Sequence, residues 1–167
     1  FRENVLMKLK DIDFDLNNLV LLFQGMSSTA NMVRYAYMNI ISNLYSENFS
    51  QVIGNWCKEK EIDYVGHVIE DNNAHSRLGY GAGHYFRSIA GQTMAGIDII
   101  GGQIVPGMDY HHTAFSTGGS DGEFYHYALC KLGASAAKLD KNKNGRLMCE
   151  AFGAYGWVEG LKMMKWI

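Results

Sequence analysis

Two short apolar segments of this chain each end in a glutamate, and a loop rich in polar, glycine or aromatic residues follows each of them. The first is Tyr64–Glu70, with the sequence YVGHVIE, and the second is Arg146–Glu150, with the sequence RLMCE. Short apolar runs without polar alternation are typical of strands buried in a parallel sheet. In a (β/α) barrel the catalytic groups lie at the carboxyl ends of such strands. The two segments therefore predict an α/β fold in which Glu70 and Glu150 lie at one end of the sheet.

The other segments favour parallel strands that are covered by helices. Apolar residues at helical spacing predict three helices, over 31–60 with a break near Ser46, over 122–139, and from about 157 onward. Apolar runs predict four strands, over 19–23, 63–69, 96–100 and 146–149. We expect long loops after the strands, and the loop after 96–100 carries His111.

The length of the chain bears on its architecture. A complete (β/α)8 barrel needs about 250 residues, whereas this chain has 167. It starts at Phe1, and Ile167 lies inside a helical pattern that no glycine or cap ends. We therefore expect 1–167 to be a fragment of one catalytic barrel domain, truncated at both ends. The rest of the parent chain would then be needed to complete the barrel.

Composition excludes some classes of partner. A hydrophobic fraction of 47% and a charged fraction of 19% are typical of a folded domain with one core. The formal net charge of −2 gives no reason to expect binding to nucleic acid or to an anionic membrane. The three cysteines match no metal or redox spacing, and no HxH or HExxH pair is present.

Three motifs together resemble a known group of enzymes. They are VIEDNN at 68–73, GAGHYF at 81–86 and CEAFGAYGW at 149–157. The chain resembles large multidomain bacterial glycoside hydrolases over about residues 30–167, and especially the α-L-rhamnosidase-like enzymes of glycoside hydrolase family 106. This resemblance implies a (β/α)8 barrel, two catalytic glutamates on its strands and an inverting mechanism. It also implies calcium at the active site, although no ligand residue for calcium can be matched in this chain.

The residues themselves suit the same chemistry. Glycoside cleavage needs one protonated carboxyl beside the leaving oxygen and one ionised carboxyl near the anomeric carbon or its attacking water. The charge of Asp71 would raise the proton affinity of Glu70, which favours the role of general acid. Glu150 precedes aromatic residues whose faces suit a sugar ring, which favours the role of base or nucleophile. A single glutamate after a strand more often meets solvent or a lysine, but two in the same context favour catalysis.

Further residues are candidates for sugar contact. They are the loop residues with amide, imidazole or aromatic side chains, namely Asn73, His75, His111, Tyr155 and Trp157. Each of them would look the same as an ordinary loop residue. His67 faces either the barrel interior or a partner within the core, and the pattern does not choose between the two.

One calcium-like motif is rejected. Asp140–Gly145 opens like an EF-hand loop, but the twelfth position is Ala151 and Glu150 comes one residue too early. We interpret it as a polar turn.

The leading hypothesis is a glycosidase, with an α-L-rhamnoside as the first substrate and another glycoside, such as a β-galactoside, as the second. The alternatives are a non-catalytic carbohydrate-binding barrel domain and, less favoured, a metal-dependent hydrolase that uses the histidines.

Overall fold

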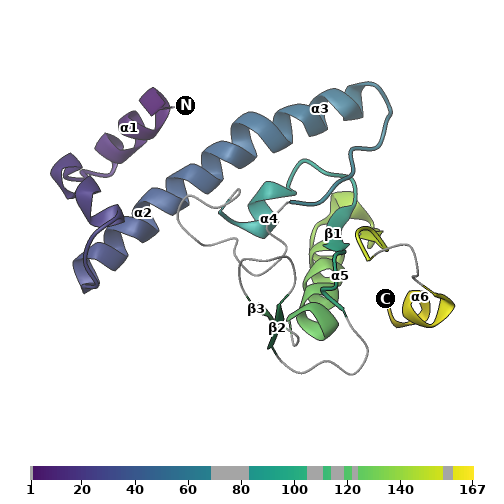
Figure 1. Ribbon diagram of the computed structural model, residues 1–167. Coiled ribbons are helices and arrows are strands. Elements are labelled where there is room, and N and C mark those ends of the chain that lie inside the picture. The colour runs from purple at the N-terminus through teal and green to yellow at the C-terminus, as the bar shows by residue number, and fades with distance from the viewer. Residues whose placement is uncertain (1, 69–82, 105–110, 114–118, 122–123, 156–159) are drawn as a thin grey trace.

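The computed structural model describes residues 2–68, 83–104, 111–113, 119–121, 124–155 and 160–167 (Figure 1). The N-terminal part contains helix α1 (Arg2–Asp11), the 3-10 helix η1 (Leu16–Leu22), helix α2 (Ser28–Tyr45), the π-helical turn η2 (Ser46–Ser50) and helix α3 (Gln51–Glu59). Helix α4 (Tyr85–Ser88) and strands β1 (Ala95–Ile99), β2 (His111–Thr113) and β3 (Gly119–Asp121) follow. The C-terminal part contains the π-helical turn η3 (Phe124–Ala128), helix α5 (Leu129–Leu139), the 3-10 turn η4 (Lys141–Lys143), strand β4 (Leu147–Ala151) and helix α6 (Leu161–Trp166).

Strands β1 and β4 form a parallel pair, and α5 connects them. Their register runs from Ala95 opposite Leu147 to Ile99 opposite Ala151. All five residues of β1 are buried, as expected for a strand inside an α/β unit. The α/β class and the strands near 96–100 and 146–149 are therefore confirmed, and the helix predicted over 122–139 is confirmed for 124–139, the part that the structure describes. Within the segment expected to be a long loop, β2 and β3 form an additional antiparallel pair.

Helix α5 covers one face of the β1–β4 pair. A methyl group placed on Gly133 of α5 would lie 2.8 Å from Leu147 Cδ1 and 2.9 Å from Ile97 Cγ2. Since side chains alternate along a strand, Asp98 and Glu150 extend from the opposite face. The core around the strands is a cluster of eleven buried residues, namely Val68, Tyr85, Ile89, Ala95, Ile97, Ile99, Ile104, Tyr125, Leu129, Ala136 and Ala137.

The N-terminal half of the long helix carries a second, smaller core. Its buried members are Val5 and Leu9 of α1 and Ile40 and Leu44 of α2. Figure 1 shows α1 beside the first half of α2, while α3 continues toward the strands. The predicted helix over 31–60 and its break near Ser46 are confirmed, because η2 interrupts the run between α2 and α3. No helix in the described ranges is both long and apolar enough to cross a membrane.

The prediction of a strand over 19–23 is wrong. These residues lie largely in η1, and the carboxylate of Asp15 caps it by accepting a hydrogen bond from Asn17 N at 2.9 Å. Leu16, Leu19 and Leu22 are spaced three residues apart, which is the period of a 3-10 helix. Leu22 is buried, and Leu16 and Leu19 pack on the smaller core. The apolar run therefore forms one side of a helix.

The prediction of a strand over 63–69 is wrong for 63–68, the part that the structure describes. This segment forms no ladder, and its only backbone hydrogen bond to the turn before β1 joins Thr93 N to Tyr64 O at 2.9 Å. A side chain on Gly96 would collide with the carbonyl oxygen of Gly66. Gly96 and Asp98 lie on the same face of β1, so the segment 63–68 crosses that face. Because the segment lies over the face of the strand and not beside its edge, its backbone does not pair with the sheet.

Candidate functional site

Two acidic residues lie at the carboxyl ends of the parallel strands. Asp98 is the penultimate residue of β1, Glu150 is the penultimate residue of β4, and the two are partners in the strand register. Neighbouring strands lie about 4.8 Å apart, so the two side chains leave the same face from adjacent positions. Ligands of parallel α/β sheets bind outside the carboxyl ends of the strands. This end of the sheet is therefore the candidate site.

His67 belongs to the segment 63–68 that crosses β1, called the crossing segment below, and it contacts this site. Its Nε2 lies 2.8 Å from Glu150 Oε2, and its Nδ1 lies 3.3 Å from Val68 O. The histidine side chain is 20% exposed and the glutamate side chain 55% exposed. Glu150 is thus oriented by a partner while its carboxylate still faces solvent, as a group that meets a substrate must.

Asp98 is a candidate residue that reasoning from the sequence missed. Only 6% of it is exposed, although it is an acid, because it lies in the buried strand β1. A buried carboxyl group is costly and is retained mainly where it has a partner or a function. The signal was present in Gly96-Ile-Asp-Ile-Ile100, where a single acid interrupts an apolar strand.

The loop that follows β4 is attached to the loop that follows β1. Gly101 N donates to Gly153 O at 2.9 Å, and Ile104 N donates to the hydroxyl of Tyr155 at 3.1 Å. Phe152 and Ala154 adopt left-handed backbone angles, with φ of 69° and 59°. Such angles are uncommon for residues other than glycine and are frequent near functional sites. Tyr155 therefore helps to shape the site by holding the neighbouring loop.

The predicted site residues divide into three groups. Glu150 and Tyr155 lie at the candidate site. His111 lies on β2, where its backbone is paired with that of Asp121, and it is not among the described residues that contact Glu150. The others lie outside the described residues, and they are Glu70, Asn73, His75 and Trp157. The expected convergence of Glu70 and Glu150 stays a prediction.

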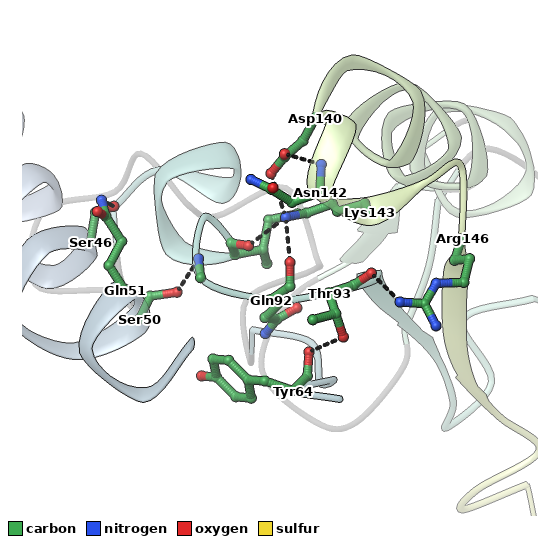
Figure 2. A network of polar contacts seen from close by, with 12 residues as sticks. Ser46, Ser50, Gln51, Tyr64, Gln92, Thr93, Asp140, Asn142, Lys143 and Arg146 are labelled. Carbon is green, nitrogen blue, oxygen red and sulfur yellow. Dashed lines mark hydrogen bonds and ion pairs between the residues drawn. The ribbon is translucent and has the colours of Figure 1, made fainter. Parts of the chain in front are cut away.

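The opposite end of the sheet is held by a buried lysine (Figure 2). Lys143 Nζ donates to Ile89 O and Gln92 O, both at 2.9 Å, and to Asp140 Oδ2 at 2.7 Å. An ammonium group has three donors, and all three are used here. Burial acts to raise the pKa of Asp140, but hydrogen bonds from Lys143 and from the backbone of Asn142 outweigh it and lower that pKa. The polar turn predicted over 140–145 is confirmed.

A second polar contact lies at the same end. Arg146, just before β4, donates to both carboxylate oxygens of Asp63 at 3.0 and 3.1 Å. Hydrogen bonds from Arg146 and then Thr93 lower the pKa of Asp63. Arg146 also reaches Thr93 O at 3.2 Å, as Figure 2 shows. These contacts join the segments that precede the strands, at the end opposite to the candidate site.

The described part of the structure also contains cavities away from the candidate site. One of about 520 Å³ lies at the amino ends of the strands, and Gln51, Asn55, Lys58, Asp63 and Gln92 are among the residues that line it. Another of about 360 Å³ lies between α2 and α4 and is lined by Arg34, Tyr35, Met38, Asn39, Ser42, Gly83, His84 and Arg87. Neither cavity is lined by Asp98 or Glu150, so both cavities are separate from the candidate site.

Neither a metal site nor a similar known protein helps to assign a function to this site. Within the described ranges, no three His, Cys, Asp or Glu side chains are arranged to hold a metal ion. Comparison of the chain with protein-family models, with curated proteins and with solved structures finds no match.

Proposed function

We propose that this chain carries the catalytic carboxylates of a glycoside hydrolase. The observation that supports the proposal best is Glu150 at the carboxyl end of β4, bound to His67 and beside Asp98 in the register of the parallel pair. Cleavage at an anomeric carbon needs two carboxyl groups on opposite sides of the scissile bond, and they lie about 5–5.5 Å apart in retaining enzymes and about 6.5–9.5 Å apart in inverting enzymes. Glu150 is the base or nucleophile in this proposal, and Glu70 is the general acid.

The surroundings of Glu150 support this role. The carboxylate is half-exposed, whereas the strand beside it is buried. Phe152 and Tyr155 follow it in a strained loop, and apolar ring faces are suited to the apolar side of a sugar. The substrate proposed first is an α-L-rhamnoside, and another glycoside such as a β-galactoside is the second.

We also propose that the β1–α5–β4 unit belongs to a (β/α)8 barrel. It is supported by two adjacent parallel strands, a connecting helix on one face and acidic residues at the carboxyl ends. In this arrangement further strands would pair with the outer edges of β1 and β4.

The proposal is tested by hydrolysis of a panel of nitrophenyl glycosides by the intact protein. With a substrate that is turned over, Glu150→Gln should lower kcat by about 10²–10⁴-fold, because the change removes the negative charge while it keeps the size. Glu59→Gln, an exposed residue of α3, is the matched control and should leave kcat unchanged. Turnover by Glu150→Gln close to that of the unchanged protein would exclude Glu150 from the mechanism.

A second comparison identifies the acid. Glu70→Gln should lose most activity on substrates with poor leaving groups and little on nitrophenyl glycosides, since good leaving groups need no protonation. Asp98→Asn is assayed in parallel, and the same dependence there instead would assign the acid to Asp98. Tight sugar binding without turnover on any substrate would favour the alternative, a non-catalytic carbohydrate-binding barrel domain.

A further inference from the structure

The ring of His67 lies between two oxygen atoms. Nδ1 is 3.3 Å from the carbonyl oxygen of Val68, and Nε2 is 2.8 Å from Glu150 Oε2. A carbonyl oxygen only accepts hydrogen bonds, and so does an ionised carboxylate. A neutral imidazole has one N–H donor, whereas an imidazolium has two. A protonated ring beside an ionised glutamate makes both contacts at once, and so does a neutral ring beside a protonated glutamate. The Glu150 side chain is 55% exposed, and water stabilises an ionised carboxylate, so the first arrangement is favoured.

We propose that His67 is an imidazolium that holds Glu150 as an oriented carboxylate, and that it is a positioning residue of this site. The proposed protonation state rests on the two contacts and on the exposure of Glu150, while the role of His67 in catalysis rests on the proposed function. One oxygen of the carboxylate is bound by His67, so the other oxygen is available for attack at the anomeric carbon or on a water molecule. In this pair Glu150 is ionised and serves as the base or nucleophile, so another carboxyl group must serve as the general acid.

The charges around the ring agree with this assignment. Glu150 of β4 and Asp98 of β1 are the acidic groups on the face that the crossing segment covers. The guanidinium of Arg146 lies at the other end of the strands, where Asp63 binds it through both oxygens. Within the described residues, the strand groups on this face therefore favour a positive ring. An opposite charge at hydrogen-bond distance stabilises the charged form of a histidine.

The test is nitrogen NMR of the chain labelled with 15N at its histidine rings. At neutral pH both ring nitrogens of His67 should have the shifts of an imidazolium, and the signal is assigned by its loss in His67→Gln. In Glu150→Gln the ring should become neutral, with one protonated and one unprotonated nitrogen. His84 serves as the internal reference, because burial and then Arg87 lower its pKa and Glu150→Gln should not alter its signal.

Two results would overturn the inference. One is a neutral His67 ring at neutral pH in the unchanged chain, and the other is an imidazolium that persists unaltered in Glu150→Gln. Circular dichroism of Glu150→Gln checks that the variant is folded, and Glu150→Ala is a second variant that removes the partner altogether. These measurements need no substrate, so they decide the protonation state even where no glycoside is hydrolysed.

Kinetics on a substrate that is turned over test the positioning role. His67→Gln should lower kcat by about 10- to 100-fold, the range expected for loss of a charged hydrogen bond, and should change KM little. His84→Gln is the matched control and should keep the kcat of the unchanged protein. An undiminished kcat in His67→Gln would reject the positioning role while the proposed function, tested through Glu150, would stand.

Discussion

At the scale of single residues, Lys143 is a test of what a buried charge contributes to stability. Its side chain is 1% exposed and joins two backbone carbonyls and Asp140. Lys143→Met keeps much of the apolar stem but leaves these acceptors without their donor, so we expect the free energy of unfolding to fall by about 3 kcal/mol. Urea denaturation measures the change. Lys141→Met, an exposed neighbour, should change it by less than about 0.5 kcal/mol, and equal effects of the two would show that the ammonium group contributes nothing.

Asp140 makes part of this stability dependent on pH. Its pKa in the folded chain is lowered, chiefly because the hydrogen bonds from Lys143 and Asn142 outweigh burial. A carboxyl group with a lowered folded pKa stabilises the fold above its unfolded pKa, about 3.9, and loses this contribution as the pH falls through the folded pKa. Urea unfolding at pH 6 and pH 2.5 should therefore show a smaller difference between the unchanged chain and Asp140→Asn at pH 2.5 than at pH 6. A difference that is independent of pH would contradict the assignment.

Single residues also show how far the site could be predicted. The sequence names Glu150 and Tyr155 as candidates because a strand end and an aromatic loop are local patterns, and their roles stay predictions. Asp98, His67 and Lys143 depend on segments that are far apart along the chain, such as His67 and Glu150, 83 positions apart. No pattern of spacing encodes which segments meet, so His67 remained ambiguous and Asp98 was passed over.

At the scale of elements, α3 packs on the turn after α4 through glycines. A side chain on Gly54 would collide with the carbonyl oxygen of Gly91, which belongs to backbone and cannot move aside cheaply. Gly54→Ala should lower the free energy of unfolding by about 1–3 kcal/mol, even though alanine favours a helix by about 1 kcal/mol. Thermal or urea unfolding measures the effect.

The matched control for this contact is Gly160→Ala. Among the described residues no atom lies within 4 Å of the added methyl group, and φ at Gly160 is −103°, which other residues adopt readily. Gly160 is the N-cap of α6, where glycine is preferred over alanine, so this variant should lose only about 0.5 kcal/mol. A Gly54→Ala chain as stable as the Gly160→Ala chain would show that α3 and the turn can separate at little cost.

The elements that the sequence placed incorrectly have a common cause. A short apolar run has no period of its own, and neighbouring segments decide what it becomes. Residues 19–22 belong to a 3-10 helix that the carboxylate of Asp15 caps. Residues 63–68 pack on Gly96 and cross the face of β1. The long helix and α5 were predicted correctly because their helical period extends over many residues.

At the scale of the whole molecule, the described part of the chain has two cores of unequal size. The core around β1 has eleven buried residues, while the core beneath α1 has four. Local opening is easiest where few apolar contacts must be broken. Hydrogen exchange followed by mass spectrometry should therefore show β1 as the slowest peptide and α1 as one of the fastest. Equal protection of α1 and β1 would indicate that the two cores unfold together.

The α/β class of the molecule could be predicted from the sequence, and so could the parallel pair near 96–100 and 146–149. These follow from the order of helical and apolar segments, which local patterns record. The barrel stays a proposal, since the β1–β4 pair shows neighbouring strands and not the closure of a sheet.

The two ends of the β1–β4 pair differ in what holds them, and this suggests how the protein could be engineered. The contacts of Lys143 and Arg146 with Asp63 and with residues 89–93 all lie before the strands. Residues 100–104 and 152–155 lie after them. On the function proposed above, a library that varies the second set of positions can search for altered substrate preference while the contacts of Lys143 and Arg146 stay intact. A library that varies the first set can be selected for resistance to heat without changing the positions at the other end.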